Sequence, residues 1–377
     1  MIYLDQAATT PVRREVLEAM WPFLGPEFGN PSSHHEVGES ARAALEQARA
    51  DVAQVLGCRA SEITFTSGGT ESDNAAIKGI ALAAPRGRHV IVSAVEHPAV
   101  LESARFLARL GYEVDELGVD RHGMVSPADL AAALHDDTTL VSIQLANNEV
   151  GTIQQIETLA RLARQCGAPF HTDAVQAAGT LDLDVGRLGV QALSLSGHKI
   201  GAPKGVGVLY LDRRTPYEPL LHGGGQEAGR RSGTENVAAA VGMAAALRLV
   251  GGGIDDLVAR RDAFIARVVA EVPSAELTGH PGHRLPGSAS FVFPGTSGES
   301  ILVELEARGI VCSSGSACAA GDDDPSHVLI AMGLEPEVAQ TAVRFTFGAT
   351  TTAEDLDTAA DEVAVAVATV TGNGHRS

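Results

Sequence analysis

The chain has 377 residues, a length that suggests two or three structural domains. Of these residues 45% are hydrophobic and 20% charged, which is typical of a globular protein. Its 47 acidic and 28 basic side chains give a net charge of −19, which disfavours direct binding to nucleic acid or to an anionic membrane. No apolar run reaches about 18 residues and Met1 does not begin a signal peptide, so we expect a cytoplasmic protein that spans no membrane.

Strand-like and helix-like segments alternate over the first two thirds of the chain. Strands that alternate with helices of about 10 to 15 residues indicate crossover connections and a mostly parallel sheet, so an α/β fold is expected. The expected strands are 61–66, 89–94, 139–146, 169–172, 192–195 and 206–211, and the expected helices between them are 70–84, 98–110 and 155–166.

The regular alternation of strands and helices ends after a long helical segment at about 234–250. Gly251-Gly252-Gly253 follows it and reads as a hinge. A helix at 255–271, strands near 288–293 and 343–347, and a final helix from Ala353 then predict a smaller α+β domain. The expected domain boundaries are 13–250 for the large domain, and 1–12 together with 251–377 for the small one.

Lys199 is the strongest candidate nucleophile. It ends the segment 194–199, follows a short apolar strand at 192–195 and leads into a glycine-rich turn. A lysine in such a turn loses hydration, which lowers its pKa and frees the amine as a nucleophile. The ordinary alternative is a solvated loop lysine. The nearby glycines do not form a P-loop, because the GxxxxGK[ST] order is absent.

Two other segments match what pyridoxal phosphate requires. Asp173 follows an apolar strand, and an enzyme that uses this cofactor needs a carboxylate beside the pyridine nitrogen to keep the ring protonated. Gly69 and Thr70 begin a helix directly after a strand, where backbone N–H groups and the helix dipole attract phosphate. A glycine turn before a helix is often only structural, so its weight here comes from Lys199 and Asp173.

His97 and Asn148 also follow apolar strands. Ligands of open α/β sheets gather at the carboxyl ends of the strands, so both residues are expected at the same edge as Lys199. A lone histidine is more often a satisfied polar residue than a catalyst. The position of His97 among the other candidate loops favours a place in the site.

Four cysteines, Cys58, Cys166, Cys312 and Cys318, are too few for a disulfide scaffold and lack the C-x-x-C spacing of a zinc site, so no metal is expected. Cys318 lies in a loop of Ser, Gly and Ala at about 311–322, which favours an exposed, reactive thiol. Cys312 follows a strand-like segment and is expected to be structural. A disulfide or metal pair between Cys312 and Cys318 is an open alternative.

Taken together, these motifs resemble the cysteine desulfurases, the class V aminotransferase-like branch of fold type I pyridoxal-phosphate enzymes. The resemblance runs nearly from end to end of the chain. The segments that carry it are 3–11, 29–34, 66–74, 96–97, 147–149, 173–176, 196–199, 223–227, 231–234, 313–318 and 343–345. The Ser-Ser-Gly-Ser-Ala-Cys form of 313–318 is similar to the group that supplies sulfur for iron–sulfur clusters and thiolated products.

The resemblance implies a mostly parallel seven-stranded sheet in the large domain, a homodimer, and a role for each matching residue. Lys199, Cys318 and His97 would be catalytic, with Lys199 binding pyridoxal 5′-phosphate covalently and Cys318 receiving the sulfur. Further cofactor contacts would come from Asp173 at the pyridine nitrogen, Gln176 at the ring hydroxyl, Asn148 near the ring, Gly69, Thr70, Ser196 and His198 at the phosphate, and Thr234 from the second subunit. Asn30, Asn148 and Arg344 would bind the substrate, Arg344 by a bidentate pair with its carboxylate.

The reaction implied is conversion of L-cysteine to L-alanine, with the sulfur passing as a persulfide on Cys318 to an acceptor protein. A selenocysteine lyase or cysteine-sulfinate desulfinase on the same scaffold is the alternative enzyme, and it would not need the Cys318 thiol. A general transaminase would leave Cys318 without a role, and an inactive cofactor-bound scaffold would not produce alanine. The identity of the acceptor does not follow from the sequence.

Overall fold

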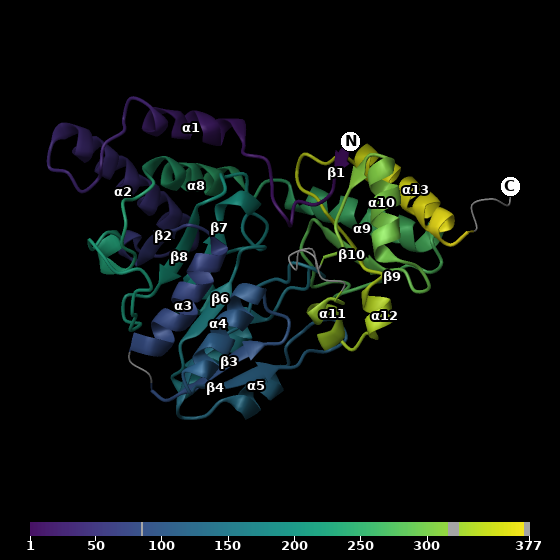
Figure 1. The fold of residues 1–377 in the computed structure, drawn as a ribbon, viewed down its shortest axis with the longest axis horizontal. Coiled ribbons are helices and arrows are strands. Elements are labelled where there is room, and N and C mark those ends of the chain that lie inside the picture. Colours follow the sequence, from purple (N-terminus) through teal and green to yellow (C-terminus); the bar gives the residue numbers. More distant parts are fainter. Residues whose placement is uncertain (84–85, 316–323, 373–377) are drawn as a thin grey trace.

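The computed structural model describes residues 1–83, 86–315 and 324–372. Its centre is a seven-stranded sheet in the order β2-β8-β7-β6-β5-β3-β4 (Figure 1). The strands β4, β3, β5, β6 and β7 run parallel, and β8 is antiparallel to both β7 and β2. The expected α/β fold with a mostly parallel seven-stranded sheet is therefore confirmed. The strands are β2 (Ile63–Thr66), β3 (His89–Ser93), β4 (Glu113–Leu117), β5 (Thr138–Ser142), β6 (Phe170–Asp173), β7 (Ala192–Ser196) and β8 (Gly207–Leu211).

Helices cover both faces of this sheet, because consecutive strand residues point to opposite sides. In β3, Val90 and Val92 pack in the hydrophobic cluster that includes α3 (Gly69–Ala83) and α4 (Pro98–Arg109). Ile91 between them belongs to the cluster on the other face. That second cluster includes side chains of α1 (Arg14–Leu24), α2 (Glu36–Leu56), α6 (Ile156–Cys166) and α8 (Val237–Leu249).

The last third of the chain forms a second, smaller layer beside the large sheet (Figure 1). β10 (Ser288–Val292) pairs antiparallel with β9 (Glu276–Leu277) and β12 (Val343–Thr346). Helices α9 (Ile254–Glu271), α10 (Gly298–Ala307) and α13 (Ala353–Val370) pack on it around Phe264, whose ring meets those of Phe291, Phe345 and Phe347 edge to face.

The first residues of the chain join this smaller layer. β1 (Ile2–Tyr3) pairs in parallel with β11 (Ile310–Val311), and Leu4 is fully buried in the same core as Phe291. A further hydrophobic cluster joins the two layers, since it contains Val95 and Val150 from the large sheet region together with Val292 and Val328.

The shorter helices and turns are α5 (Pro127–Ala133), α7 (Val185–Leu188), α11 (His327–Ala331), α12 (Pro336–Ala339), η1 (Ala60–Glu62), η2 (Gly197–Lys199) and η3 (Glu227–Gly229).

The glycine segment 251–253 connects α8 to α9. Gly253 adopts a left-handed φ of 72°, which glycine reaches without steric cost, and the axes of α8 and α9 differ by 77° across this break. Among the described residues, no single helix has the length and composition to cross a membrane, although α8 and α9 together pass that test as a bent pair.

The observed elements differ from the expected ones in several respects. Helices α1 and α2, strand β4 and helix α5 were not predicted from the sequence. The expected strand at 139–146 ends at Ser142, because the side chains of Gln144 and Asn147 bond to the Val95 carbonyl and turn the chain toward the site. The expected helix at 234–250 begins only at Val237, where the Asn236 side chain caps it.

Candidate active site

The ends of several strands meet at one edge of the large sheet, as predicted from their parallel order. The register places Thr66 at the end of β2, Gly207 at the start of β8 and Ser196 at the end of β7 side by side. A Cβ atom at Gly207 would lie only 2.6 Å from the Gly68 carbonyl carbon. Glycine at 207 therefore allows the turn before α3 to lie directly beside the turn that carries Lys199.

Lys199 ends the short η2 turn that follows β7. Its ammonium group donates hydrogen bonds to the carbonyl oxygens of Ala7 and Ala8, the second at 2.9 Å. The Gln176 side chain also donates to the Ala7 carbonyl, at 3.1 Å. The amino-terminal segment thus crosses the sheet edge and brings Lys199 and Gln176 to one place.

Asp173 ends β6 and is 7% exposed. Its Oδ1 accepts a hydrogen bond of 2.8 Å from the Val175 backbone. Burial raises the pKa of the Asp173 carboxyl, while the nearby His97 and Lys199 favour the ionised form. A buried carboxyl group in this state is a suitable partner for a cation such as a protonated pyridine ring, because the pair relieves the cost of burying the charge.

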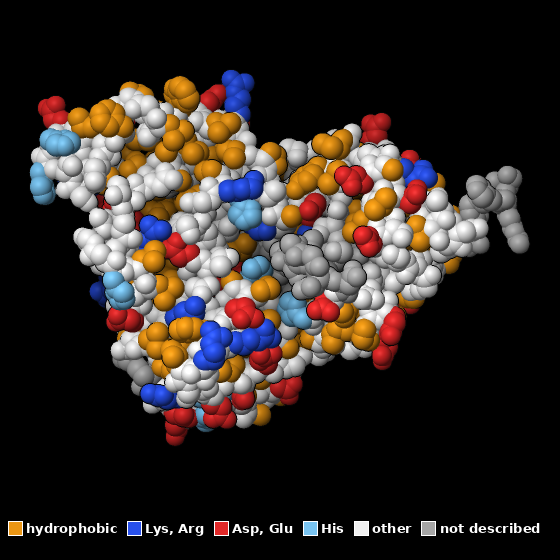
Figure 2. All heavy atoms as spheres, in the orientation of Figure 1, with side chains coloured by type: hydrophobic (Ala, Val, Ile, Leu, Met, Phe, Trp, Pro, Cys, Tyr) orange, Lys and Arg blue, Asp and Glu red, His pale blue; other side chains and the backbone are white. Residues whose placement is uncertain are grey.

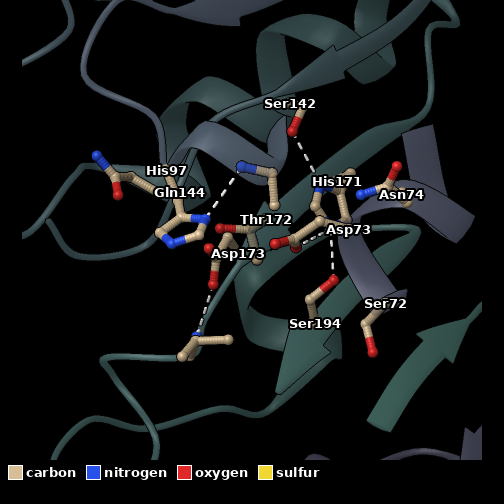
Figure 3. Close-up of polar contacts among 12 residues, drawn as sticks. Ser72, Asp73, Asn74, His97, Ser142, Gln144, His171, Thr172, Asp173 and Ser194 are labelled. Carbon is tan, nitrogen blue, oxygen red and sulfur yellow. Dashed lines mark hydrogen bonds and ion pairs between the residues drawn. The ribbon is translucent and has the colours of Figure 1, made fainter. Parts of the chain in front are cut away.

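His97 lies beside Asp173 (Figure 3). It caps α4, with its Nδ1 accepting a hydrogen bond of 3.1 Å from the Ala99 backbone, so Nε2 carries the ring hydrogen of the neutral tautomer. Burial lowers the pKa of His97, and the charge of Lys199 lowers it further, whereas Asp173 raises it. A neutral imidazole of this kind is suited to proton transfer near neutral pH.

The expected phosphate site lies between the starts of α3 and η2. A Cβ atom at Gly69 would approach the Val175 side chain to 2.8 Å and the Ser196 Cβ to 3.4 Å, so glycine allows the helix start to lie directly against Val175 and Ser196. His198 Nδ1 lies 3.2 Å from the Thr9 hydroxyl, and burial lowers the pKa of His198 to about 4. The first residues of α3, including Thr70, direct the positive end of a 15-residue helix toward the expected phosphate site.

Arg344 and Asn148 meet on the side that faces the smaller layer. The Arg344 Nη1 donates to the Asn148 carbonyl at 2.9 Å and its Nη2 donates to Asp5 Oδ1 at 2.7 Å. The Arg344 Nε is buried and has no hydrogen-bond partner among the described residues. A buried donor without a partner is costly, so this guanidinium group is suited to donate a hydrogen bond to one further carboxylate oxygen.

Three predicted residues are not brought into this cluster by the described contacts. Asn30 lies in the exposed turn between α1 and α2, where its side chain accepts a hydrogen bond of 2.9 Å from the Ser32 backbone. Thr234 is exposed between η3 and α8. Cys318 lies outside the described residues. The chain that leads toward it is anchored at Ser313, whose backbone N–H and carbonyl both bond to the backbone of Arg344.

Cys312 agrees with the structural role expected for it. It packs against the core of the smaller layer, and burial raises the pKa of its thiol to about 12. A thiol with so high a pKa carries little thiolate at neutral pH and reacts slowly. In the part of the chain that the structure describes, no group of three or more His, Cys, Asp or Glu side chains is arranged to hold a metal ion.

Three buried polar residues near Asp173 were not predicted from the sequence as part of the site. Asp73, Glu96 and His171 are each at most 1% exposed. Burial raises the pKa of Glu96 to about 8 and lowers the pKa of His171 to about 3. A signal was present in the sequence, because His171 lies two residues before Asp173 and strand residues at that spacing share one face.

Comparison with known proteins places this geometry in a wider group. Residues 2–358 match the family model described as Aminotransferase class-V. The chain is 49% identical to "Cysteine desulfurase IscS" of Dictyoglomus turgidum over 94% of its own length and 92% of that protein. It is 46% identical to "Cysteine desulfurase NifS" of Azotobacter vinelandii over 97% of its length and 92% of that protein.

Solved structures show the same similarity. A structure titled "NIFS-LIKE PROTEIN" matches with a TM-score of 0.89 and 37% identity, covering 96% of this chain and 98% of the other. The structure "SspA in complex with cysteine" matches with a TM-score of 0.83 and 36% identity over 92% of this chain and 99% of the other. DndA from Streptomyces lividans matches with a TM-score of 0.75 and 37% identity over 91% of this chain and 99% of that one.

Proposed function

The chain belongs to the class-V aminotransferase family and is a cysteine desulfurase within it, and from this premise we propose how its own residues perform the reaction. The family depends on pyridoxal 5′-phosphate. We propose that Lys199 binds this cofactor in the present chain and that Cys318 receives the sulfur of L-cysteine. The observation that supports this most directly is the carboxyl group of Asp173, which is buried, lies near the Lys199 amine and is suited to pair with a cation.

The residues at the sheet edge fit the cofactor. When bound, it draws electrons away from the substrate carbon that carries the amino group. The Asp173 carboxylate would pair with the pyridine N–H, and Gln176 would bond to the ring hydroxyl. The remaining contacts that we propose are phosphate contacts from Gly69, Thr70, Ser196 and His198, contact near the ring from Asn148, and a phosphate contact from Thr234 of a second subunit.

Lys199 and His97 would move the protons. The Lys199 amine would remove the proton from the substrate Cα and return one later. His97 would assist through Nε2. Proton transfer by a positioned side chain typically accelerates a step by about 10²- to 10⁴-fold.

Arg344 would hold the carboxylate of L-cysteine. Its buried Nε has no partner among the described residues, and its two Nη atoms donate to the Asn148 carbonyl and to Asp5. We keep Asn30 as a further substrate contact only as a prediction from the family resemblance. One similar protein has been solved in complex with cysteine, as its title states, which supports the same substrate here.

The sulfur step would use Cys318 as nucleophile. Its thiolate attacks the substrate sulfur, so an S–S bond forms and the C–S bond breaks. The electron pair of the broken bond remains on the substrate carbon, which takes up a proton and leaves as the methyl group of L-alanine. The enzyme then holds a persulfide, whose outer sulfur passes to an acceptor protein in the synthesis of iron–sulfur clusters, thiolated tRNA or another sulfur-containing product.

A homodimer is part of the proposal. Helix α1 and the turn after it expose Leu17, Trp21, Leu24 and Phe28 by 53 to 76%, and Figure 2 shows hydrophobic side chains gathered over this part of the molecule. An apolar face of this kind favours a protein interface over free surface. We also propose a cytoplasmic location, because the reaction needs a reduced thiol.

We further propose the domain boundaries 13–250 and 1–12 with 251–377. The separate hydrophobic clusters of the two layers support them, since Leu4 packs with the core formed by residues after 251.

The test is to supply purified protein with pyridoxal 5′-phosphate and L-cysteine, quantify L-alanine, and trap the persulfide for mass spectrometry. We expect equal amounts of alanine and of sulfur released by a reductant, with the trapped sulfur on the peptide that contains Cys318. Alanine formation without a trapped persulfide would favour the alternative lyase chemistry. Pull-down with the persulfidated protein would then identify the acceptor.

A further inference from the structure

Three polar side chains form a row across the face of the large sheet that α3 covers. Ser142 of β5, His171 of β6 and Ser194 of β7 alternate with apolar residues that pack on the opposite face. His171 lies in the middle, with Nδ1 2.8 Å from the Ser142 hydroxyl and Nε2 2.9 Å from the Ser194 hydroxyl. All three side chains are fully buried, so this row holds its hydrogen bonds out of water.

Asp73 of α3 completes the row (Figure 3). Its carboxyl group accepts a hydrogen bond from Ser194, and its Oδ1 lies 3.7 Å from His171 Nε2. The residue is 1% exposed, and Oδ1 has no hydrogen-bond partner among the described residues. A carboxylate at such a place would be costly, whereas a protonated carboxyl group would not carry a buried charge.

The row lies next to Asp173 on the same face of the sheet. Ser194 is the cross-strand neighbour of Asp173, and His171 precedes Asp173 by two residues on the same face of β6. After burial, the charge of Asp173 is the next largest cause that raises the pKa of Asp73, because two neighbouring carboxylates repel each other. Two neighbouring buried carboxyl groups therefore favour a state in which only one is ionised.

The other groups that face Asp73 do not offer it a cation. His171 stays neutral, because burial lowers its pKa to about 3. Glu96, from the segment after β3, is a third carboxyl group, and its ionised form would raise the pKa of Asp73 further. The cationic group of the site, Lys199, acts on Asp173 instead and favours its ionised form.

We propose that Asp73 is a positioning residue that stays protonated between Ser194, His171 and Asp173, so that the single negative charge of this cluster stays on Asp173. The inference deepens the proposed function, since it explains how Asp173 keeps the charge that a pyridine N–H requires. Asp73 touches neither cofactor nor substrate and acts through Asp173. The hydrogen-bonded row holds the Asp73 carboxyl in place, and its protonated state removes a competing charge.

The first test is infrared spectroscopy of the protein without cofactor. Glu96 absorbs in the same region but is present in both proteins. The difference spectrum between the wild-type chain and Asp73→Asn therefore isolates the Asp73 band. We expect the carbonyl stretch of a protonated carboxylic acid at pH 7.5, shifting to lower frequency in heavy water. Carboxylate stretches in its place would overturn the proposal, whatever the activity of the protein.

The second test measures binding of 4′-deoxypyridoxine 5′-phosphate, which keeps the pyridine nitrogen and phosphate but lacks the aldehyde. Asn is neutral and similar in shape to a protonated Asp, so Asp73→Asn should bind the probe within about twofold of wild type from pH 6.5 to 8.5. Asp73→Leu removes the partner of Ser194 and should weaken binding by about tenfold or more, as expected for a broken buried hydrogen-bond network. If Asp73→Asn changes the affinity by about tenfold or alters its pH profile, Asp73 is ionised and the proposal fails.

These outcomes are distinct from a failure of the proposed function. If wild type does not bind the probe, the assignment of the cofactor site is wrong, whereas the infrared result on Asp73 still stands or falls by itself. If Asp73→Leu does not fold, Asp73→Asn and the infrared spectrum still decide the protonation state.

Discussion

Asp5 and Arg344 form an ion pair with 2.7 Å between Oδ1 and Nη2, although 339 residues separate them in the chain. The Arg344 side chain is 4% exposed and that of Asp5 is 17% exposed. The arginine proposed to bind the substrate carboxylate is thus already paired with a protein carboxylate. A substrate must share this guanidinium group with Asp5 or displace it.

This pair predicts a selective effect on substrate affinity. Asp5→Asn keeps an oxygen acceptor for Arg344 but removes the competing charge, so the KM for L-cysteine should fall by roughly three- to tenfold, which corresponds to one hydrogen bond of about 0.5 to 1.5 kcal/mol. The value of kcat should change little. Steady-state kinetics measure both, with the exposed Glu337→Gln as a control for the loss of one negative charge. A rise in KM would show that Asp5 positions Arg344 and does not compete with substrate.

Removal of the proposed nucleophilic amine should abolish cofactor attachment. Lys199→Ala is expected to lose the visible absorption of covalently bound pyridoxal 5′-phosphate and all measurable turnover, because it removes the amine that is proposed to bind the cofactor. Lys204→Ala is the matched control, since Lys204 is exposed and lies in the same loop. Retention of the absorption band in Lys199→Ala would refute the assignment.

The two cysteines of the 311–322 segment should respond differently to mutation. Cys318→Ser should keep the cofactor absorption but release no sulfide from L-cysteine, because the hydroxyl group is a poor nucleophile toward sulfur. Cys312→Ser should retain desulfurase activity within about threefold, although loss of a buried apolar contact lowers stability by about 1 kcal/mol. Full activity in Cys318→Ser would assign the sulfur transfer to another group.

Glu96 predicts a pH dependence of stability. Burial raises its pKa from 4.5 in the unfolded chain to about 8, so the folded chain holds a proton that the unfolded chain has lost between these values. The Glu96 contribution to the free energy of unfolding therefore falls as pH rises from about 4.5 to about 8, by up to about 1.4 kcal/mol per pH unit.

Glu96→Gln removes this titration and keeps the oxygen acceptor for Ser93 and the Gln144 backbone. Its stability relative to wild type should increase between pH 5 and pH 8 and stay constant above that. Urea denaturation at a series of pH values measures the difference. A constant difference across the whole range would show that Glu96 is ionised in the folded chain.

Much of the site follows from the sequence because parallel strands end at a common edge. Lys199, Asp173 and His97 each come directly after an apolar strand, so strand order alone brings them together. Gly69 is predictable for the same reason, as a glycine turn between a strand and a helix. The roles of Asn30, Thr234 and Cys318 rest on the family resemblance and stay predictions.

The sequence by itself therefore determined the α/β fold, the expected edge of the sheet and the residues gathered there, since these depend on local periodicity and strand order. Only the tertiary structure revealed the Asp5–Arg344 pair and the Asp73 row. Both depend on how elements far apart in the chain pack, the amino terminus against β12 in one case and α3 against the sheet in the other. Local sequence patterns carry no information on which buried charges meet, because that is decided by side chains from separate elements competing for the same partners in a space without water.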